Sequence, residues 1–176
     1  MMFIPFEPIH LLIVSDVNTI VETENGGIDT LKLGEILKSK GPCLTLMNPD
    51  PIACGGLGML FSHSAEAWLR LSQGARGPHV AREIRKQVNT WINDLQLVRL
   101  QATGPVEWKD LCRWWEWLGM QYEGTLRQYG PNGDDYFMYA LFSGRWVGQG
   151  GGLVGDGGIF TSRQTARQHT AHKYLG

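Results

Sequence analysis

The apolar residues in the second half of the chain change their spacing twice, and each change marks a predicted element. A short apolar run over 96–101 predicts a strand. The dipeptide Gly104-Pro105 interrupts it, and apolar residues then recur at helical spacing, which predicts a helix over 106–118. Gly119 is placed to end this helix, since glycine is common just past a helix C-terminus. The apolar side of the helix consists of Leu111, Trp114, Trp115 and Leu118.

Two more strands are predicted after this helix, over 120–127 and 134–141. The sequence YGPNG lies between them, at 129–133. Proline, asparagine and glycine supply the backbone angles of tight turns, so this segment predicts a hairpin.

The first half of the chain predicts a further set of elements. Residues 30–38 have the apolar spacing of a short helix. Strands are expected over 43–47 and 52–57, joined as a hairpin by the proline-rich turn between them. A third strand fits 65–71. Residues 1–14 are predicted to hold a first strand, broken by prolines.

The most regular amphipathic pattern lies over 78–93 and predicts a long helix. Pro78 suits its first turn, where the missing backbone N–H would be unpaired anyway. Basic and acidic residues separate the apolar ones, which are Val80, Ile84, Val88, Trp91 and Ile92.

The end of the second long helix and the strands after it resemble the GNAT N-acetyltransferase superfamily. The residues that carry this resemblance are WLGM at 117–120, YEG at 122–124, LR at 126–127 and DDYFMYAL at 134–141. The order of predicted elements fits the family over residues 3–141. The resemblance implies a GNAT-like α/β (α+β) fold, with a mixed, mostly antiparallel sheet flanked by helices and a Gly-rich C-terminal extension.

The resemblance also locates a cofactor loop. In this family, the loop before the central helix holds the pyrophosphate of acetyl-CoA through backbone amides and the helix dipole. The matching residues of this chain are Arg76, Gly77, Val80 and Ala81, but His79 stands where the family has glycine. A side chain there would crowd the phosphate path. We therefore expect a degenerate site and no cofactor, with acetyl-CoA as the alternative.

The catalytic positions of the family are also altered. The common general acid is a tyrosine in the fourth helix, about four residues before the Leu-Gly pair. Trp115 occupies that place and cannot donate a proton to a leaving thiolate at useful pH. Glu66 lies near the position of a glutamate that is sometimes the general base. The prediction is that no residue is catalytic, and that Glu66 would be the base in an active protein; a solvated strand-edge carboxylate is the other interpretation.

A second point of likeness concerns a narrower group of proteins. The sequence SAEAWLRLS at 64–72, followed by the basic helix over 78–93, is similar to acetyltransferase-like proteins of short-tailed bacteriophages. Those proteins are internal or tail-associated components of the virion. The resemblance implies the same location for this chain.

The chain is predicted to divide into a GNAT-like domain at 1–141, a Gly-rich linker at 142–158 and a docking peptide at 159–176. Seven of the eleven residues in 148–158 are glycine, a composition typical of flexible linkers. The last segment has no acidic side chain, so it is expected to bind an acidic groove on a partner. Its predicted partner-binding residues are Phe160, Arg163, Arg167, Lys173 and Tyr174.

Charge and composition exclude several classes of function. A formal net charge of −1 favours neither a nucleic-acid nor a membrane partner, and no apolar run is long enough to span a bilayer. The three cysteines lack metal-site spacing and indicate a reducing compartment. The histidines and aspartates also lack the spacing of a metal site, so no metal is predicted.

These features predict a non-catalytic structural component of a bacteriophage virion that uses a degenerate acetyltransferase fold as a binding module. The expected partners are other virion proteins of the tail or portal, in multiple copies within a symmetric assembly. The protein would be made in the host bacterial cytoplasm. An acetyl-CoA-dependent N-acetyltransferase is the alternative, and an interaction module of a cellular complex is a third possibility.

Overall fold

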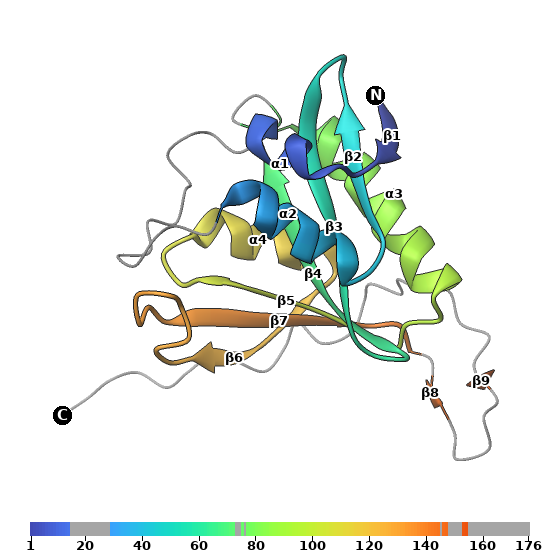
Figure 1. Ribbon diagram of the computed structural model, residues 1–176. Coiled ribbons are helices and arrows are strands. Elements are labelled where there is room, and N and C mark those ends of the chain that lie inside the picture. Colours follow the sequence, from blue (N-terminus) through green and yellow to red (C-terminus); the bar gives the residue numbers. More distant parts are fainter. Residues whose placement is uncertain (15–28, 73–74, 76, 145, 148–152, 155–176) are drawn as a thin grey trace.

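Of the 176 residues in the chain, the computed structural model describes 1–14, 29–72, 75, 77–144, 146–147 and 153–154. The strands are β1 (Met2–Pro5), β2 (Cys43–Met47), β3 (Pro51–Phe61), β4 (Ser64–Leu71), β5 (Arg99–Pro105), β6 (Gln121–Leu126), β7 (Tyr136–Phe142), β8 (Trp146–Val147) and β9 (Leu153–Val154). The helices are α1 (Pro8–Val14), α2 (Thr30–Ser39), α3 (Pro78–Asp94) and α4 (Lys109–Leu118). The large sheet has the strand order β1-β2-β3-β4-β5-β7-β6, and β8 pairs with β9 separately (Figure 1).

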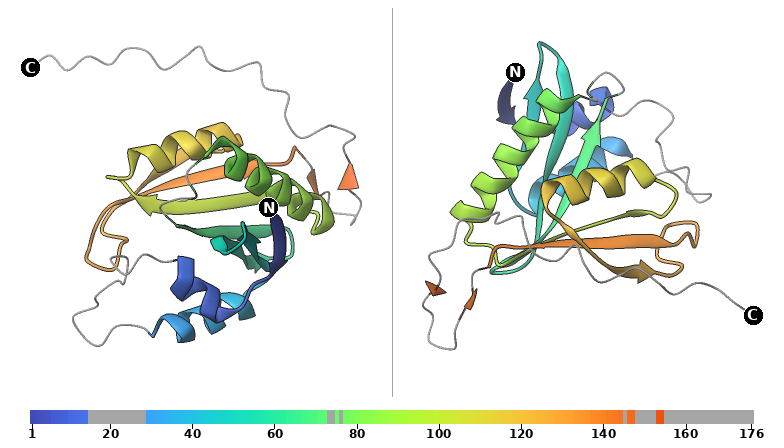
Figure 2. Two further views of the ribbon diagram at one scale, coloured as in Figure 1. Left: turned by 90° about the horizontal axis from the view of Figure 1, so that it is seen from above. Right: turned by 180° about the vertical axis from the view of Figure 1, so that it is seen from behind.

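Neighbouring strands of the large sheet are antiparallel except β4 and β5, which are parallel. Helices α3 and α4 cover one face of the sheet, and α1 and α2 cover the other (Figure 2). This arrangement confirms the predicted fold class, a mixed and mostly antiparallel sheet flanked by helices. Within the described part of the chain, none of the helices is long and apolar enough to cross a bilayer.

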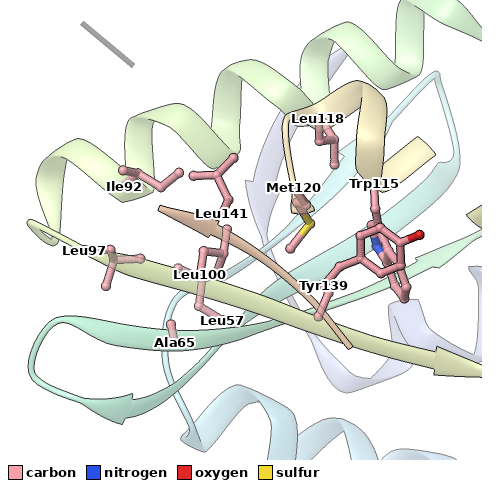
Figure 3. Close-up of a cluster of buried hydrophobic side chains, with 11 residues drawn as sticks. Leu57, Ala65, Ile92, Leu97, Leu100, Trp115, Leu118, Met120, Tyr139 and Leu141 are labelled. Carbon is pink, nitrogen blue, oxygen red and sulfur yellow. The ribbon is translucent and has the colours of Figure 1, made fainter. Parts of the chain in front are cut away.

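The largest buried cluster lies between the sheet and the helices α3 and α4 (Figure 3). Strand β5 shows why it forms on this face. Leu100 and Ala102 are buried in the cluster, while Arg99, Gln101 and Thr103 alternate with them and so point to the opposite face. The members of the cluster are Leu57, Ala65, Ile92, Leu97, Leu100, Ala102, Trp115, Leu118, Met120, Tyr139 and Leu141.

A separate cluster fills the opposite face, where α1 lies over β3. It is built on Phe6, Leu11, Val14 and Cys54, with Trp68 packed against it. Helix α1 corrects the prediction for residues 1–14, which expected only a strand. A proline is tolerated in the first turn of a helix, so Pro8 begins α1 instead of breaking a strand.

The boundaries around β5 also differ from the prediction. The strand was expected over 96–101 and the next helix from residue 106, but β5 runs from Arg99 to Pro105 and α4 begins at Lys109. Residue Gln96 has a positive φ of 53° and belongs to the turn before the strand. The strand continues through Pro105 because its whole length pairs with β7.

Gly104 therefore does not interrupt the strand. It is the point where α4 packs closely on β5. A Cβ atom added there would lie 2.8 Å from Leu111 Cδ2 and 2.8 Å from Trp115 Cη2. Only a residue without a side chain lets α4 pack this closely on β5. The sequence pattern interpreted this glycine as the end of the strand, whereas it lies inside the strand and is required there by the packing of α4.

Two glycines have the backbone role that the sequence predicted. Gly119 ends α4 with a φ of 92°, and its N–H bonds to the carbonyl oxygen of Glu116 at 2.9 Å. Gly133 has a φ of 78° in the turn between β6 and β7. Both conformations are left-handed and favour glycine, which confirms the helix end and the hairpin.

Replacing Gly104 with alanine is expected to destabilise the fold by about 1–3 kcal/mol, because the new methyl group would overlap two core side chains. Gly124 is the matched control, since it also lies in a strand but a Cβ there would meet no atom within 4 Å. Urea unfolding of both variants measures the difference. Equal stability of Gly104→Ala and Gly124→Ala would contradict the close packing of α4 on β5.

The C-terminal part of the chain is described only in fragments. Strands β8 and β9 fall within residues 142–158, which the sequence analysis assigned to a linker, and Trp146 pairs with Val154. The predicted docking segment 159–176 lies outside the described residues, as do its residues Phe160, Arg163, Arg167, Lys173 and Tyr174. Its predicted role stays a prediction.

Candidate active site

The parallel strands β4 and β5 separate after a short paired region. Their paired residues are only Ser64 with Arg99, Ala65 with Leu100 and Glu66 with Gln101. Beyond these pairs β4 continues to Leu71 and β5 to Pro105, and the two strands diverge (Figure 1). From residue 67 onward, the edge of β4 that faces β5 therefore has no strand partner among the described residues. Its backbone N–H and C=O groups are available to an extended ligand that carries amides.

Glu66 lies at the point where the two strands separate. Its cross-strand neighbours are Gly58 of β3 and Gln101 of β5, and Gln101 is the last residue of β5 that pairs with β4. Trp68, two residues farther along β4, packs against the cluster under α1, so Glu66 points to the same face of the sheet. One Glu66 oxygen, Oε1, accepts a hydrogen bond from Thr103 Oγ1 at 3.1 Å, and both residues are half-buried.

Helix α3 begins close to the far end of β4. Gly77 is its N-cap residue in an extended conformation, and no side chain of the described residues caps the helix start. The N–H of Ala81 already bonds to the Gly77 carbonyl oxygen at 3.1 Å. The amides of His79 and Val80 belong to the first turn, where helix geometry provides no partner. The start of α3 thus presents two amides and the positive end of a 17-residue helix.

The residues predicted for the cofactor loop have distinct environments. A Cβ added at Gly77 would meet no atom within 4 Å, so the space beside this glycine is open. The side chain of His79 is exposed and does not fill that space. Val80 is buried against the sheet with Ile84, so only its amide can face a ligand. Arg76 lies outside the described residues.

Trp115 is a core residue. It is 5% exposed, and its ring centroid lies 5.2 Å from that of Tyr139. The hydroxyl of Tyr139 donates a hydrogen bond to Glu116 Oε1 at 3.1 Å. Burial is the main cause that raises the pKa of Tyr139 well above its usual range, and the nearby Cys112 and Glu116 raise it further. The phenol therefore keeps its proton at neutral pH. The sequence analysis did not single out this phenol.

An ion pair joins β5 to β6, with Arg99 on the face of the sheet opposite the largest cluster. Arg99 of β5 donates to both carboxylate oxygens of Glu123, and the Nη1–Oε1 distance is 2.9 Å. Glu123 lies at an irregularity in the pairing of β6 with β7. The hydrogen bond from Arg99 holds the pKa of Glu123 below its usual range. Arg99 and Gln101 are also bonded to each other, at 3.1 Å, so these three polar groups are mutually engaged.

Thr103 is the site residue that sequence reasoning missed. A signal was present, because Arg99, Gln101 and Thr103 form a polar stripe alternating with apolar residues. The prediction ended the strand at 101 and so left Thr103 outside it. Only the longer strand places the Thr103 hydroxyl opposite Glu66.

Comparison with solved structures shows a GNAT acetyltransferase fold, while no family model and no curated protein matches the sequence. A spermidine N-acetyltransferase mutant from Vibrio cholerae superposes with a TM-score of 0.64 at 14% identity, covering 81% of this chain and 95% of that one. A GNAT-family acetyltransferase from Bacillus anthracis has a TM-score of 0.63 at 18% identity, covering 80% and 93%. A ribosomal-protein-alanine N-acetyltransferase from Brucella melitensis has a TM-score of 0.65 at 15% identity, covering 81% and 99%.

These comparisons overturn one prediction of the sequence analysis. The chain was predicted to be a non-catalytic structural component of a bacteriophage virion, and that prediction is wrong. The neighbours named above are all acetyltransferases, and the match spans nearly their whole length. No comparison supports a bacteriophage origin or a place in a virion or its tail, whereas the acetyltransferase-like fold is supported. The virion location rested on the short likeness over 64–72, and the lack of catalysis was inferred from the altered positions His79 and Trp115. Neither feature reports on backbone groups, which can bind an anion at a helix start.

Proposed function

We propose that this protein is an acetyl-CoA-dependent N-acetyltransferase. The observation that carries the proposal is the separation of β4 from β5 directly after Glu66. Within the part of the chain that the structure describes, it leaves one edge of β4 unpaired beside a carboxylate. The fold supports the proposal, because its neighbours of known fold include several acetyltransferases. Fold alone does not assign function, so the residues of the site must carry the chemistry.

The unpaired edge of β4 fits the extended arm of acetyl-CoA, which contains amide groups. An amide chain laid along residues 67–71 could bond to the main chain as an added strand does. This mode of binding uses backbone groups and therefore does not depend on the side chains of the family motif. It explains how a cofactor site can survive when its sequence motif is altered.

The start of α3 fits the pyrophosphate. The first-turn amides of His79 and Val80 and the helix dipole attract an anion, and the space beside Gly77 is open. The sequence analysis expected His79 to obstruct the phosphates. In this proposal it does not, because its exposed side chain leaves the space beside Gly77 free. Of the residues named from the sequence, Gly77 and Val80 keep a role, whereas the amide of Ala81 is already bonded within the helix.

Acetyl-CoA, when bound, supplies an acetyl group activated as a thioester. The acceptor is proposed to be an amine, as it is for the spermidine and ribosomal-protein-alanine acetyltransferases. An alkylamine has a pKa of about 10.4 and must lose a proton before it can attack. Glu66 is the proposed general base that takes this proton, since its carboxylate is half-buried where the strands separate.

A separate general acid is not required for this chemistry. Trp115 is not an acid at useful pH, because its indole N–H does not ionise there, and its ring is packed in the core. An alkyl thiol has a pKa of about 8.5, so a thiolate is an acceptable leaving group near neutral pH. The absence of a tyrosine at position 115 therefore lowers the efficiency of such an enzyme without excluding the reaction.

Titration calorimetry with acetyl-CoA tests the cofactor site, and Gly77 provides a matched pair of variants. Aspartate and asparagine are both good N-cap residues, so Gly77→Asp and Gly77→Asn should fold at least as well as the wild type. Only the aspartate places a negative charge beside the phosphates. We expect micromolar binding by the wild type and by Gly77→Asn, and binding weaker by about tenfold in Gly77→Asp.

An activity assay tests the reaction itself. The protein is incubated with acetyl-CoA and a panel of amines that includes polyamines, amino acids and short peptides with free N-termini. Release of free thiol is followed with a thiol-reactive chromophore, and the acetylated product is identified by mass spectrometry. No binding of acetyl-CoA at millimolar concentration, together with no acetylated product, would reject the proposed function.

A further inference from the structure

A side-chain hydrogen bond links β4 to β5 beyond the point where their main chains stop pairing. Thr103 lies two residues past Gln101, the last residue of β5 that pairs with β4. Its Oγ1 nevertheless reaches back and donates to Glu66 Oε1 at 3.1 Å. The bond therefore joins the two strands where they begin to diverge. Its acceptor is the carboxylate proposed as the general base.

This hydroxyl is the group that can hold the Glu66 carboxylate in place. Among the described residues, Glu66 forms no ion pair, and Thr103 is its one side-chain hydrogen-bond partner. A glutamate side chain has several rotatable bonds and loses considerable entropy when it is held in one conformation. Threonine is stiff at χ1, so its hydroxyl is a donor with a well-defined position.

The surroundings of Thr103 make it a firm support. Strand β5 is paired with β7 along its whole length, and Thr103 itself lies opposite Met138. The other polar side chains on this stripe are already engaged, because Arg99 bonds to both Gln101 and Glu123. They do not compete with Thr103 for the Glu66 carboxylate.

We propose that Thr103 is a positioning residue that holds the Glu66 carboxylate in the orientation needed to accept the proton of the acceptor amine. The inference rests on the proposed acetyltransferase function. Thr103 acts through Glu66, and it transfers no proton to the substrate. A residue that only links the two strands would affect the stability of the fold. Loss of the Thr103 hydroxyl should also change the rate of the chemical step.

Two substitutions separate positioning from packing. Valine has the shape of threonine without the hydroxyl, whereas serine keeps the hydroxyl and loses the methyl group. Positioning predicts that Thr103→Val lowers kcat by about tenfold, the effect of losing one hydrogen bond to a charged group, and that Thr103→Ser retains most of it. KM for acetyl-CoA should change little in both. A packing role predicts the opposite order, with Thr103→Ser the more impaired variant in kcat and in Tm.

A double-mutant cycle and crystal structures complete the test. When Glu66 is already replaced by glutamine, adding Thr103→Val should lower kcat no further, because both changes remove the same function. A crystal structure should show Glu66 in one conformer in the wild type and Thr103→Ser, and in several conformers in Thr103→Val. The structural readout does not depend on activity, so it remains decisive if the assay finds no acceptor.

Each outcome decides a different point. A single, unmoved Glu66 conformer in Thr103→Val would overturn the positioning role, whether or not the protein is active. A disordered Glu66 with unchanged kcat would show that its orientation does not matter for the reaction, and would also overturn the inference. A wild-type protein that neither binds acetyl-CoA nor acetylates any amine would reject the proposed function instead, and the inference would fall with it.

Discussion

Glu66→Gln is expected to reduce kcat by about 10²–10⁴-fold, the range that general base catalysis contributes. Glutamine has nearly the same size and can still accept the hydrogen bond from Thr103, so the local structure should be preserved. It cannot take a proton from the acceptor amine. The measurement is steady-state kinetics with acetyl-CoA and the best acceptor from the amine panel.

Glu83→Gln is the control for this substitution. Glu83 is also a partly buried glutamate, but it lies on α3 and pairs with Lys86 at 2.7 Å. Its loss should leave kcat near the wild-type value. Calorimetry should show that Glu66→Gln still binds acetyl-CoA, because the proposed cofactor contacts come from other residues. A kcat for Glu66→Gln close to that of the wild type would remove Glu66 from the mechanism.

Trp115→Ala is expected to lower the free energy of unfolding by about 3–5 kcal/mol, as is typical when a large buried aromatic residue is removed. Trp115 is 5% exposed and packs against Gly104 and Tyr139. Its removal would leave a cavity between α4 and the sheet that these neighbours cannot fill. Guanidinium unfolding followed by circular dichroism measures the loss.

Trp117→Ala is the matched control, two residues away on the same helix. Trp117 is 44% exposed, and the guanidinium of Arg85 lies 4.9 Å from its ring centroid. Its removal should cost about 1 kcal/mol or less. Trp115→Phe keeps a ring in the core and should retain most of the wild-type kcat. A large loss of kcat in a stable Trp115→Phe variant would indicate a chemical role for the indole.

The short-range pattern of the sequence was sufficient for much of the fold. Helix α3 was predicted over 78–93 and runs from Pro78 to Asp94, because its apolar residues recur at the helical period and proline suits its first turn. The end of α4 followed from Gly119, which must take a left-handed conformation. These features depend on residues within a few positions of one another, so they can be derived without knowing the tertiary structure.

The tertiary structure was needed for the features that make the site. Gly104 lies inside β5 because the whole strand pairs with β7, and α1 forms because Leu11 and Val14 pack in a buried cluster over β3. Both depend on contacts with residues that are distant in the sequence, and such contacts outweigh local preferences.

The sequence by itself predicted the order of the elements from α2 to β7, the acetyltransferase-like fold and the candidacy of Glu66. The phage likeness over 64–72, together with the altered positions His79 and Trp115, led to the wrong conclusion of a virion component, because a short likeness carries little information about function. Only the tertiary structure decided that β4 and β5 separate after Glu66 and that Thr103 bonds to its carboxylate across 37 positions of sequence. Strand pairing and its interruption are long-range events, set by the packing of the whole sheet between its two layers of helices.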